Sequence, residues 1–458
     1  MPHEQLVDER YGVVTALVSE PRQDDQLIRL HTRLAHVTDS QLLGQWQGDR
    51  IAYGASFDDP LPAAHAAIGE AVERYCGNFI PAAKLRQVSY QNLIAAGESA
   101  IAPSDWILYA PEQYHEPGFP FVPMTDDLVM NWVCAHSLTD NASAWVPAAL
   151  VYINYFTGRL RNQPHTNFVI YSGIAAGPDL ASAQRSALDE LIERDATMIW
   201  WHSGSPAIAI DASTIPGWSE LIETRKPVPE LEFIPVWLPN LMQAPVLGVT
   251  AVDHRLGTIS FGAACRAEPM AALKKALIEA AQLRGYARGL LDPEGGVWTA
   301  MSAGMLDASV YKPWREDRRY VQSYRSDYRD LTDLGCHSQF YLDPDAHYHA
   351  QRLTAPEQSC HFADIKAMPE VGRSDPAAHI SLLARHGFQA WCVDVTTPDV
   401  ALAGLSVVRV LVPGLYPNAP AAFPFLGGKR LYEEPCAQGW LGHSLKFDDL
   451  EFAPLPHS

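Results

Sequence analysis

The chain has 458 residues, of which 47% are hydrophobic, so it can bury a large core, and its length alone allows two or three domains. Its formal net charge of -19 at pH 7 argues against nucleic acid and anionic membranes as partners. The seven cysteines are odd in number and include no Cys-x-x-Cys, so neither a disulfide framework nor structural zinc is expected. Because we find no signal peptide and no apolar run of about 18 residues, the sequence predicts a soluble, cytoplasmic protein.

The first two thirds of the chain predict strands that alternate with helices. Residues 1–50 predict one strand and read as an N-terminal edge segment, followed by a main domain over 51–458. Residues 89–125 are rich in proline and aromatic residues and predict a loop. Alternating strands and helices predict a mixed α/β fold, in which a strand-loop-helix unit repeats around a shared acidic cleft. The expected strands lie near residues 11–18, 129–134, 144–153, 233–238 and 246–252.

One pattern occurs three times along the chain: a glycine, a proline near a helix start, and a helix with two spaced polar residues. Each predicted helix carries Glu-x-x-Glu or Glu-x-x-Gln away from its apolar side. A single face of this kind is usually solvated, but its threefold recurrence predicts three helices that direct acidic residues into one cleft. The glycine precedes the first glutamate by 16, 17 and 17 residues, in the pairs Gly54 with Glu70, Gly173 with Glu190, and Gly262 with Glu279.

These residue types predict a site for Mg²⁺ and a nucleotide. Clustered carboxylates repel one another unless a cation neutralises them, and a ligand set made only of oxygens favours Mg²⁺. No histidine stands at Glu-x-x-His spacing on these helices, which argues against a ferritin-like di-iron site. Glycine-rich loops, of which residues 172–179 are the clearest, are expected to offer backbone N–H groups to phosphate. Each helix also carries an arginine that can grip phosphate: Arg74, Arg194 and Arg284.

The last third of the chain is less regular. Residues 340–378 show no periodicity and predict a long surface loop, whereas strand-helix-strand order resumes over 389–415. The final residues, 451–458, are spaced by prolines and are expected to be extended. Two interpretations of this tail stay open: a frayed terminus, or a docked segment that holds the terminal carboxylate of Ser458 in the cleft.

Four motifs in combination carry a resemblance that covers about residues 50–458. They are the three acidic helices, the loop from Ser172 to Gly177, the run from Asp394 to Asp399, and Val412 to Leu415 followed by Phe425 to Tyr432. Together they resemble the YcaO superfamily and, more narrowly, the D component of azoline-forming peptide cyclodehydratases.

The resemblance implies a chemical reaction. A Cys, Ser or Thr side chain of a ribosomally made precursor peptide would attack the preceding amide carbonyl, and the resulting oxyanion would take the γ-phosphate of ATP. Loss of phosphate would then leave a thiazoline or an oxazoline ring. Thioamide or amidine formation, as in other branches of the superfamily, and a non-catalytic scaffold that docks a peptide are the alternatives.

The resemblance also implies roles for individual residues. Mg²⁺ would be held by Glu70, Glu73, Glu190 and Glu193. The carboxylate of Ser458 is the catalytic candidate, in a tail that keeps Pro454 and Pro456 of the family's Pro-x-Pro-x-Pro ending and has His457 and Ser458 where a third proline would stand. The ATP pocket would be formed by Glu70, Arg74, Ser172, Glu190, Arg194, Glu279, Gln282 and Arg284.

The expected partners follow from the same resemblance. They are the precursor peptide and a ubiquitin-activating-like or leader-binding C-type protein, because nothing in residues 1–50 indicates a leader-binding module. A flavin-dependent azoline dehydrogenase and a homodimer remain open.

Overall fold

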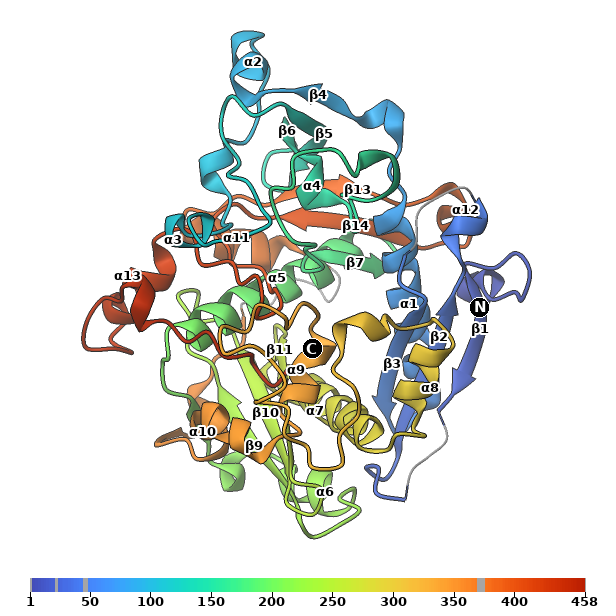
Figure 1. Cartoon of the computed structure of the whole chain (residues 1–458), viewed down its shortest axis with the longest axis vertical. Helices are drawn as coiled ribbons and strands as arrows, with labels where there is room; N and C mark the ends of the chain where they lie inside the picture. The colour runs from blue at the N-terminus through green and yellow to red at the C-terminus, as the bar shows by residue number, and fades with distance from the viewer. Residues whose placement is uncertain (1, 21–23, 44–47, 369–374, 458) are drawn as a thin grey trace.

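The computed structural model describes residues 2–20, 24–43, 48–368 and 375–457. The predicted mixed α/β class is confirmed: these residues form three separate sheets, with three long helices, α1, α5 and α7, between them (Figure 1). Within the described ranges, no helix is long and apolar enough to cross a membrane.

The strands are β1 (Val14–Ser19), β2 (Leu30–Val37), β3 (Ile51–Phe57), β4 (Arg86–Val88), β5 (Met130–Ser137), β6 (Ser143–Pro147), β7 (Ile174–Gly177), β8 (Ile208–Ile210), β9 (Leu231–Trp237), β10 (Val246–Asp253), β11 (Thr258–Cys265), β12 (Gln358–Cys360), β13 (Trp391–Asp394) and β14 (Ser406–Leu411). The helices are α1 (Pro60–Asn78), α2 (Tyr90–Ala95), α3 (Pro111–Tyr114), α4 (Ala148–Val151), α5 (Leu180–His202), α6 (Trp218–Glu223), α7 (Pro269–Leu291), α8 (Gly296–Ser302), α9 (Gly335–Phe340), α10 (Gln351–Thr354), α11 (Ala377–Arg385), α12 (Pro398–Leu402) and α13 (Arg430–Ala437).

The strands form three sheets. The first has the order β1-β2-β3, the second β11-β10-β9-β8-β12, and the third β4-β5-β13-β14-β7 with β6 paired to β5. The predicted strands near 129–134 and 144–153 correspond to the antiparallel pair β5 and β6, although β6 ends at Pro147 and α4 follows. Strand β2 pairs with β3 across residue 50, so the two sides of the predicted boundary share a sheet, and the division into 1–50 and 51–458 stays a prediction.

Two segments that were expected to be loops contain short elements. Residues 89–125 include α2 and α3, and residues 340–378 include α10 and β12, which adds to β8 as a parallel edge strand. Elements of three to six residues have too few turns or alternations to show periodicity, so their sequences did not reveal them.

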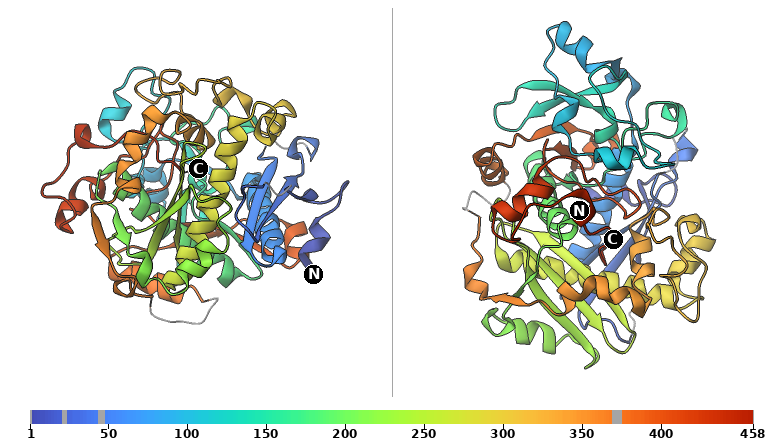
Figure 2. Two further views of the ribbon diagram at one scale, coloured as in Figure 1. Left: turned by 90° about the horizontal axis from the view of Figure 1, so that it is seen from below. Right: turned by 60° about the vertical axis from the view of Figure 1, so that its left-hand side comes forward.

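The three repeated units are β3 with α1, β7 with α5, and β11 with α7. Each helix packs on its own strand and also contacts the strand of the next unit: α1 contacts β7, α5 contacts β11, and α7 contacts β3. In Figure 2 the blue sheet β1-β2-β3 accordingly lies beside the yellow helix α7. This cyclic packing brings the three helices together in the middle of the molecule.

Two of the repeated glycines lie inside strands rather than in the expected loops. A Cβ atom on Gly54 would lie 2.1 Å from the carbonyl oxygen of Ala63, and one on Gly262 would lie 2.3 Å from that of Ala276. The glycines of β3 and β11 therefore let the following helix approach the strand closely, instead of binding phosphate in a loop.

Helix α5 is buried along the side that its sequence indicated. The buried residues include all five members of the apolar stripe: Ala187, Leu188, Leu191, Ile192 and Ile199. The C-terminal part of α5 adds Trp200 and Trp201 to the same cluster. The opposite side of α5 is thereby directed toward the acidic centre.

Candidate functional site

The acidic residues of the three helices converge. Burial, together with the nearby carboxylates of Glu70 and Glu190, raises the pKa of Glu73 to about 8. Burial, together with Glu279 and Glu190, also raises the pKa of Glu193 to about 8 against the opposing effect of Arg194. Five glutamates from α1, α5 and α7 thus repel one another across one polar centre, which is what the threefold pattern predicted.

The first glutamate of each of the first two helices is anchored to the backbone of its own unit, in β3 for Glu70 and directly before β7 for Glu190. Glu70 Oε2 accepts a hydrogen bond from the Tyr53 N–H at 2.8 Å, and Glu190 Oε2 accepts one from the Gly173 N–H at 2.9 Å. In both units the donor stands 17 residues before the glutamate. The repeated spacing therefore reflects a hydrogen bond that fixes the carboxylate to the backbone of its own unit.

The third unit differs from this arrangement, and the C-terminal tail hydrogen-bonds to β11. The Phe261 N–H donates to the Pro456 carbonyl at 2.7 Å, one residue before the donor position expected from the other units. Glu279 instead pairs with Lys275, with 3.0 Å between Oε1 and Nζ. Although burial alone would raise the pKa of Glu279, Lys275 and His457 lower it below its usual value.

Two of the predicted arginines lie within the acidic centre. Arg74 donates to Glu70 Oε1 at 3.1 Å and lies 4.2 Å from the centre of the Tyr171 ring. Arg194 Nε lies 3.3 Å from Glu193 Oε1 and 4.0 Å from Glu190 Oε1. Each arginine follows a glutamate by four residues, a spacing that places both side chains on one face of a helix.

The structure does not bring Arg284 to the same place. Its guanidinium is buried and donates to the Asp253 carboxylate, with 2.8 Å between Nε and Oδ2, and to the Asp25 carbonyl at 2.7 Å. Arg284 follows Glu279 by five residues, which turns it well away from the glutamate on a helix of 3.6 residues per turn. Its contact with phosphate stays a prediction, as does the place of the half-buried Gln282 in the nucleotide pocket.

The segment that contains Ser172 is held in place by Arg409, a residue that the sequence did not single out. Ser172 Oγ accepts the Asn418 N–H at 3.3 Å, and the Ser172 side chain is buried. Arg409 of β14 is fully buried and donates to four backbone carbonyls, so it fixes the segment that leads into β7. An arginine in a strand normally reads as a surface residue, which is why this one gave no signal. The four acceptors are the carbonyls of Val151, Ile170, Tyr171 and Ser172.

The C-terminal tail is docked rather than frayed. Residues 453–457 are all buried, and in Figure 1 the red C-terminal segment runs into the middle of the molecule. Ser458, the predicted catalytic residue, lies outside the described residues. The tail carbonyls accept hydrogen bonds from side chains and backbone: Ala453 from Trp201, Pro454 from Tyr341, Leu455 from His337, and Pro456 from Phe261.

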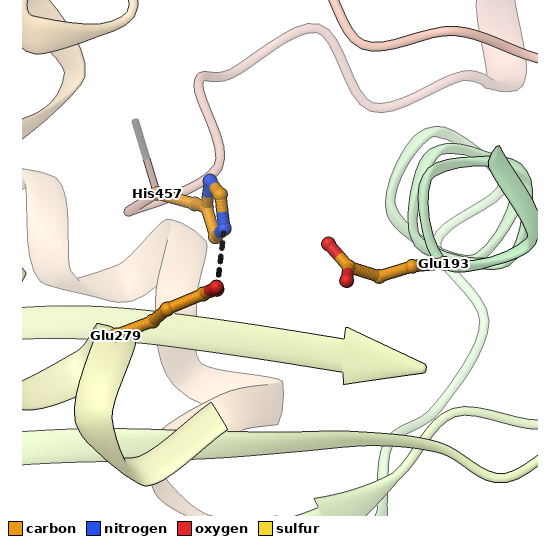
Figure 3. Close-up of side chains that lie close together, drawn as sticks. All are labelled: Glu193, Glu279 and His457. Carbon is orange, nitrogen blue, oxygen red and sulfur yellow. Dashed lines mark ion pairs between the residues drawn. The ribbon is translucent and has the colours of Figure 1, made fainter. Parts of the chain in front are cut away.

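Docking brings His457 to the glutamates (Figure 3). Ligand atoms of Glu193, Glu279 and His457 all lie within 4.8 Å of one another. The sequence did not identify His457 as a site residue, because its only signal was a position where relatives carry proline.

The residues present fit a divalent cation and a polyphosphate. Glu193 Oε1 is buried and accepts no hydrogen bond, as expected for an atom that is to bind a cation. Glu70, Glu73 and Glu190 supply further carboxylates, and Arg74 and Arg194 supply guanidinium donors for phosphate beside them.

Comparison with known proteins agrees with this chemistry. Residues 57–416 match the sequence model of a family described as YcaO cyclodehydratase, ATP- and Mg²⁺-binding. A comparison with curated proteins gives no significant match.

Solved structures share the fold. A heterocyclase in complex with substrate and cofactor is similar over 99% of this chain and 56% of its own, with 20% identity and a TM-score of 0.73. The heterocyclase TruD matches over 86% of this chain and 50% of its own, with 20% identity and a TM-score of 0.58. YcaO from Methanopyrus kandleri, bound with AMPPCP and Mg²⁺, matches over 90% and 88%, with 18% identity and a TM-score of 0.56. The chain spans about half the length of the first two structures.

Proposed function

Since the chain belongs to the YcaO family, we propose that it is an ATP-dependent peptide cyclodehydratase. Its substrates are Cys, Ser or Thr residues of a ribosomally made precursor peptide, and its products are thiazoline or oxazoline rings. The observation that carries this proposal is the convergence of five glutamates and two arginines at the centre of the three repeated units.

This arrangement suits phosphoryl transfer to an amide oxygen. Bound ATP with Mg²⁺ would supply the phosphoryl group that turns the amide oxygen into a leaving group. The protein's part is to position the reactants and to offset developing charge. Arg74 and Arg194 lie beside the carboxylates that would hold the cation, so they can contact the phosphates at the same time.

The four glutamates of α1 and α5 differ in their hydrogen bonds and in their burial, and these differences indicate different roles. Glu70 and Glu190 each use one oxygen for a backbone N–H and keep the other for a cation or an arginine. Glu73 and Glu193 are the more desolvated pair, and the pKa of each lies near 8 because burial disfavours their charge. A divalent cation would restore the charged form of both, as the predicted roles of these four residues in Mg²⁺ binding require.

The tail is proposed to take part in catalysis through the Ser458 carboxylate. The buried docking of residues 453–457 supports this role, because Ser458 is the next residue in the chain. A docked carboxylate can accept or relay the proton of the attacking side chain.

A second protein is proposed to present the substrate. Two of the solved structures that share the fold are about twice as long as the region matched by this chain, which supports a further recognition module in the working enzyme. We expect a leader-binding partner of the C type, and we expect slow cyclisation by this chain alone.

The test is ATP-dependent loss of one water per ring from a Cys-rich peptide encoded beside this gene, with the neighbouring C-type protein present. Release of ADP should accompany each ring. A Glu193→Gln variant with an unchanged circular dichroism spectrum should lose both activities. Replacement of the peptide's Cys by Ala should abolish the mass change, whereas thioamide formation would exchange oxygen for sulfur and leave no ring. A folded Glu193→Gln protein that consumes ATP normally would contradict the proposal.

A further inference from the structure

A group of aromatic rings lies partly open to solvent, away from the acidic centre. The Phe423 ring contacts the Phe121 ring edge to face, with 5.2 Å between the ring centres, and contacts the Phe168 ring at 5.5 Å. These three residues, which we call the aromatic wall, are all half-buried. The wall rests on two buried rings, because Tyr109 stacks on Phe121 at 4.9 Å and packs on Phe425 at 5.2 Å.

The aromatic wall is held in place by hydrogen bonds and by prolines. Gln113 of α3 donates from Nε2 to the Pro424 carbonyl at 2.9 Å, which fixes α3 beside the chain that leads to α13 (Figure 1). The Tyr109 hydroxyl accepts the Phe168 N–H at 2.9 Å. The loop after α3 has a proline at every third position, and proline fixes φ. A surface that is already ordered loses little conformational entropy when a ligand binds. The three prolines are Pro117, Pro120 and Pro123.

The two segments that carry most of the wall contain no charge. Residues 117–124 and 419–426 include no ionisable side chain, although 19% of the residues in the whole chain are charged. Val122, next to Phe121, is 43% exposed. Contiguous apolar residues that stay exposed are typical of a binding surface.

The wall is continuous with the nucleotide pocket. The Asn418 N–H donates to Ser172 Oγ at 3.3 Å, and both chains run from this contact to the wall. Phe168 precedes Ser172 by four residues, and Phe423 follows Asn418 by five. Since one residue spans at most about 3.6 Å, the backbone of Phe168 lies within roughly 14 Å of that of Ser172. An extended peptide covers such a distance in about four residues.

We propose that the aromatic wall binds a large apolar side chain of the precursor peptide, within about four residues of the Cys, Ser or Thr that is cyclised. This inference rests on the proposed function: the peptide amide must reach the nucleotide, so the flanking residues lie on the surface around the pocket. Rings with accessible faces favour an apolar side chain and disfavour a charged one, which would lose water without gaining a partner. Phe423 contacts both other rings, so its removal would disrupt the wall most.

Photo-crosslinking tests this contact without requiring cyclisation. Val122→p-benzoylphenylalanine places a photoreactive ketone beside the wall. Ile94→p-benzoylphenylalanine is the matched control, because Ile94 is 45% exposed on α2. The probes are synthetic peptides with one central Cys and a single Leu, which is moved through the flanking positions of an alanine background. With ADP and Mg²⁺ present, mass spectrometry should find crosslinks from position 122 to residues within about four positions of the Cys, and none from position 94.

A double-mutant cycle tests the specificity. The kcat/KM of cyclisation is measured for wild type and Phe423→Ala, with the best Leu peptide and with the same peptide carrying Ala in place of Leu. The wild type should prefer the Leu peptide about tenfold, and Phe423→Ala should remove most of this preference. A loss of folded protein or of nucleotide affinity would slow both peptides equally. Phe362→Ala, which changes a half-buried ring in a different core cluster, should keep the preference.

Three results would overturn the proposal: equal crosslinking to the peptide from the two positions, an unchanged preference for Leu in Phe423→Ala, or crosslinks from position 122 to the C-type partner with none to the peptide. The last result would assign the wall to another ligand. Crosslinks from position 122 to the peptide, without any loss of water from it, would support the wall while refuting the proposed cyclodehydratase activity. The two ideas can therefore fail separately.

Discussion

Glu73 of α1 accepts a hydrogen bond from the backbone N–H of Ala176 in β7, with 2.7 Å between Oε1 and the nitrogen. A residue of the first unit that is predicted to bind metal thus also links that unit to the second by a hydrogen bond. The sequence could not show this second role, because the two residues are 103 positions apart.

Because Glu73 is both a hydrogen-bond acceptor and an ionisable group, two substitutions can test these properties separately. Glu73→Ala should lower the free energy of unfolding by roughly 1–3 kcal/mol, since a partly buried N–H loses its acceptor. Glu73→Gln keeps an acceptor and resembles the uncharged form that the raised pKa of Glu73 favours, so it should cost much less in the absence of a divalent cation. Urea unfolding of both variants tests this, and equal destabilisation by Gln and Ala would contradict it.

The strand glycines should be intolerant of a methyl group. Gly54→Ala would place Cβ 2.1 Å from the Ala63 carbonyl oxygen, so the helix would have to move, and we expect a loss of roughly 1–3 kcal/mol of stability. Gly69 provides a matched control, because it lies in α1 with no atom within 4 Å of an added Cβ. Gly69→Ala should be neutral or stabilising by up to about 1 kcal/mol. Similar melting temperatures of the two variants would show that the close approach is unimportant.

Arg284 should contribute to stability more than to nucleotide affinity. Its removal in Arg284→Met leaves Asp253 and Asp25 buried without their shared partner, at a cost of roughly 3–5 kcal/mol. Arg74→Met, at a less buried position in the acidic centre, should instead weaken ATP binding. Urea unfolding and ATP titration of both variants measure the change in stability and the change in ATP affinity separately. A stable Arg284→Met protein with poor ATP affinity would restore the phosphate role predicted from the sequence.

The Ser458 carboxylate should affect cyclisation and not ATP binding. Extending the chain by two glycines after Ser458 moves the carboxylate but leaves the docked residues 453–457 unchanged. Deleting residues 454–458 removes the docking as well. We expect both proteins to lose cyclisation while nucleotide affinity changes little, because a group engaged in proton transfer acts on the transition state. A wild-type rate in the extended protein would dismiss the catalytic role.

His202 should make the tail's attachment sensitive to acid. Its Nδ1 donates to the Glu451 carbonyl at 2.7 Å, and burial lowers the pKa of His202 below its usual 6.5. The neutral ring is therefore favoured in the folded protein, so its contribution is complete above pH 6.5 and is lost as the pH falls toward the folded pKa. His202→Asn cannot titrate. Between pH 7.5 and 5, the wild type should lose more unfolding free energy than His202→Asn, and parallel losses would count against the idea.

The sequence predicted the parts of the site that follow a local rule. Glu70 with Arg74 and Glu190 with Arg194 share the spacing of four residues, and their convergence needed only the recognition of a repeat. The prediction placed Arg284 with them, although its spacing of five residues from Glu279 directs its side chain to another side of the helix. His457 and Arg409 could not be found, since their partners lie hundreds of residues away and no periodicity marks them.

The cyclic contacts among α1, α5 and α7 also bear on how the protein unfolds. No repeated unit can open alone, because its helix is also covered by the strand of its neighbour. Unfolding the first unit would expose β7 as well as α1, and the same holds around the ring. The acidic centre should therefore melt together with the surrounding sheets in one cooperative transition, and the loss of any one unit would dismantle the whole site.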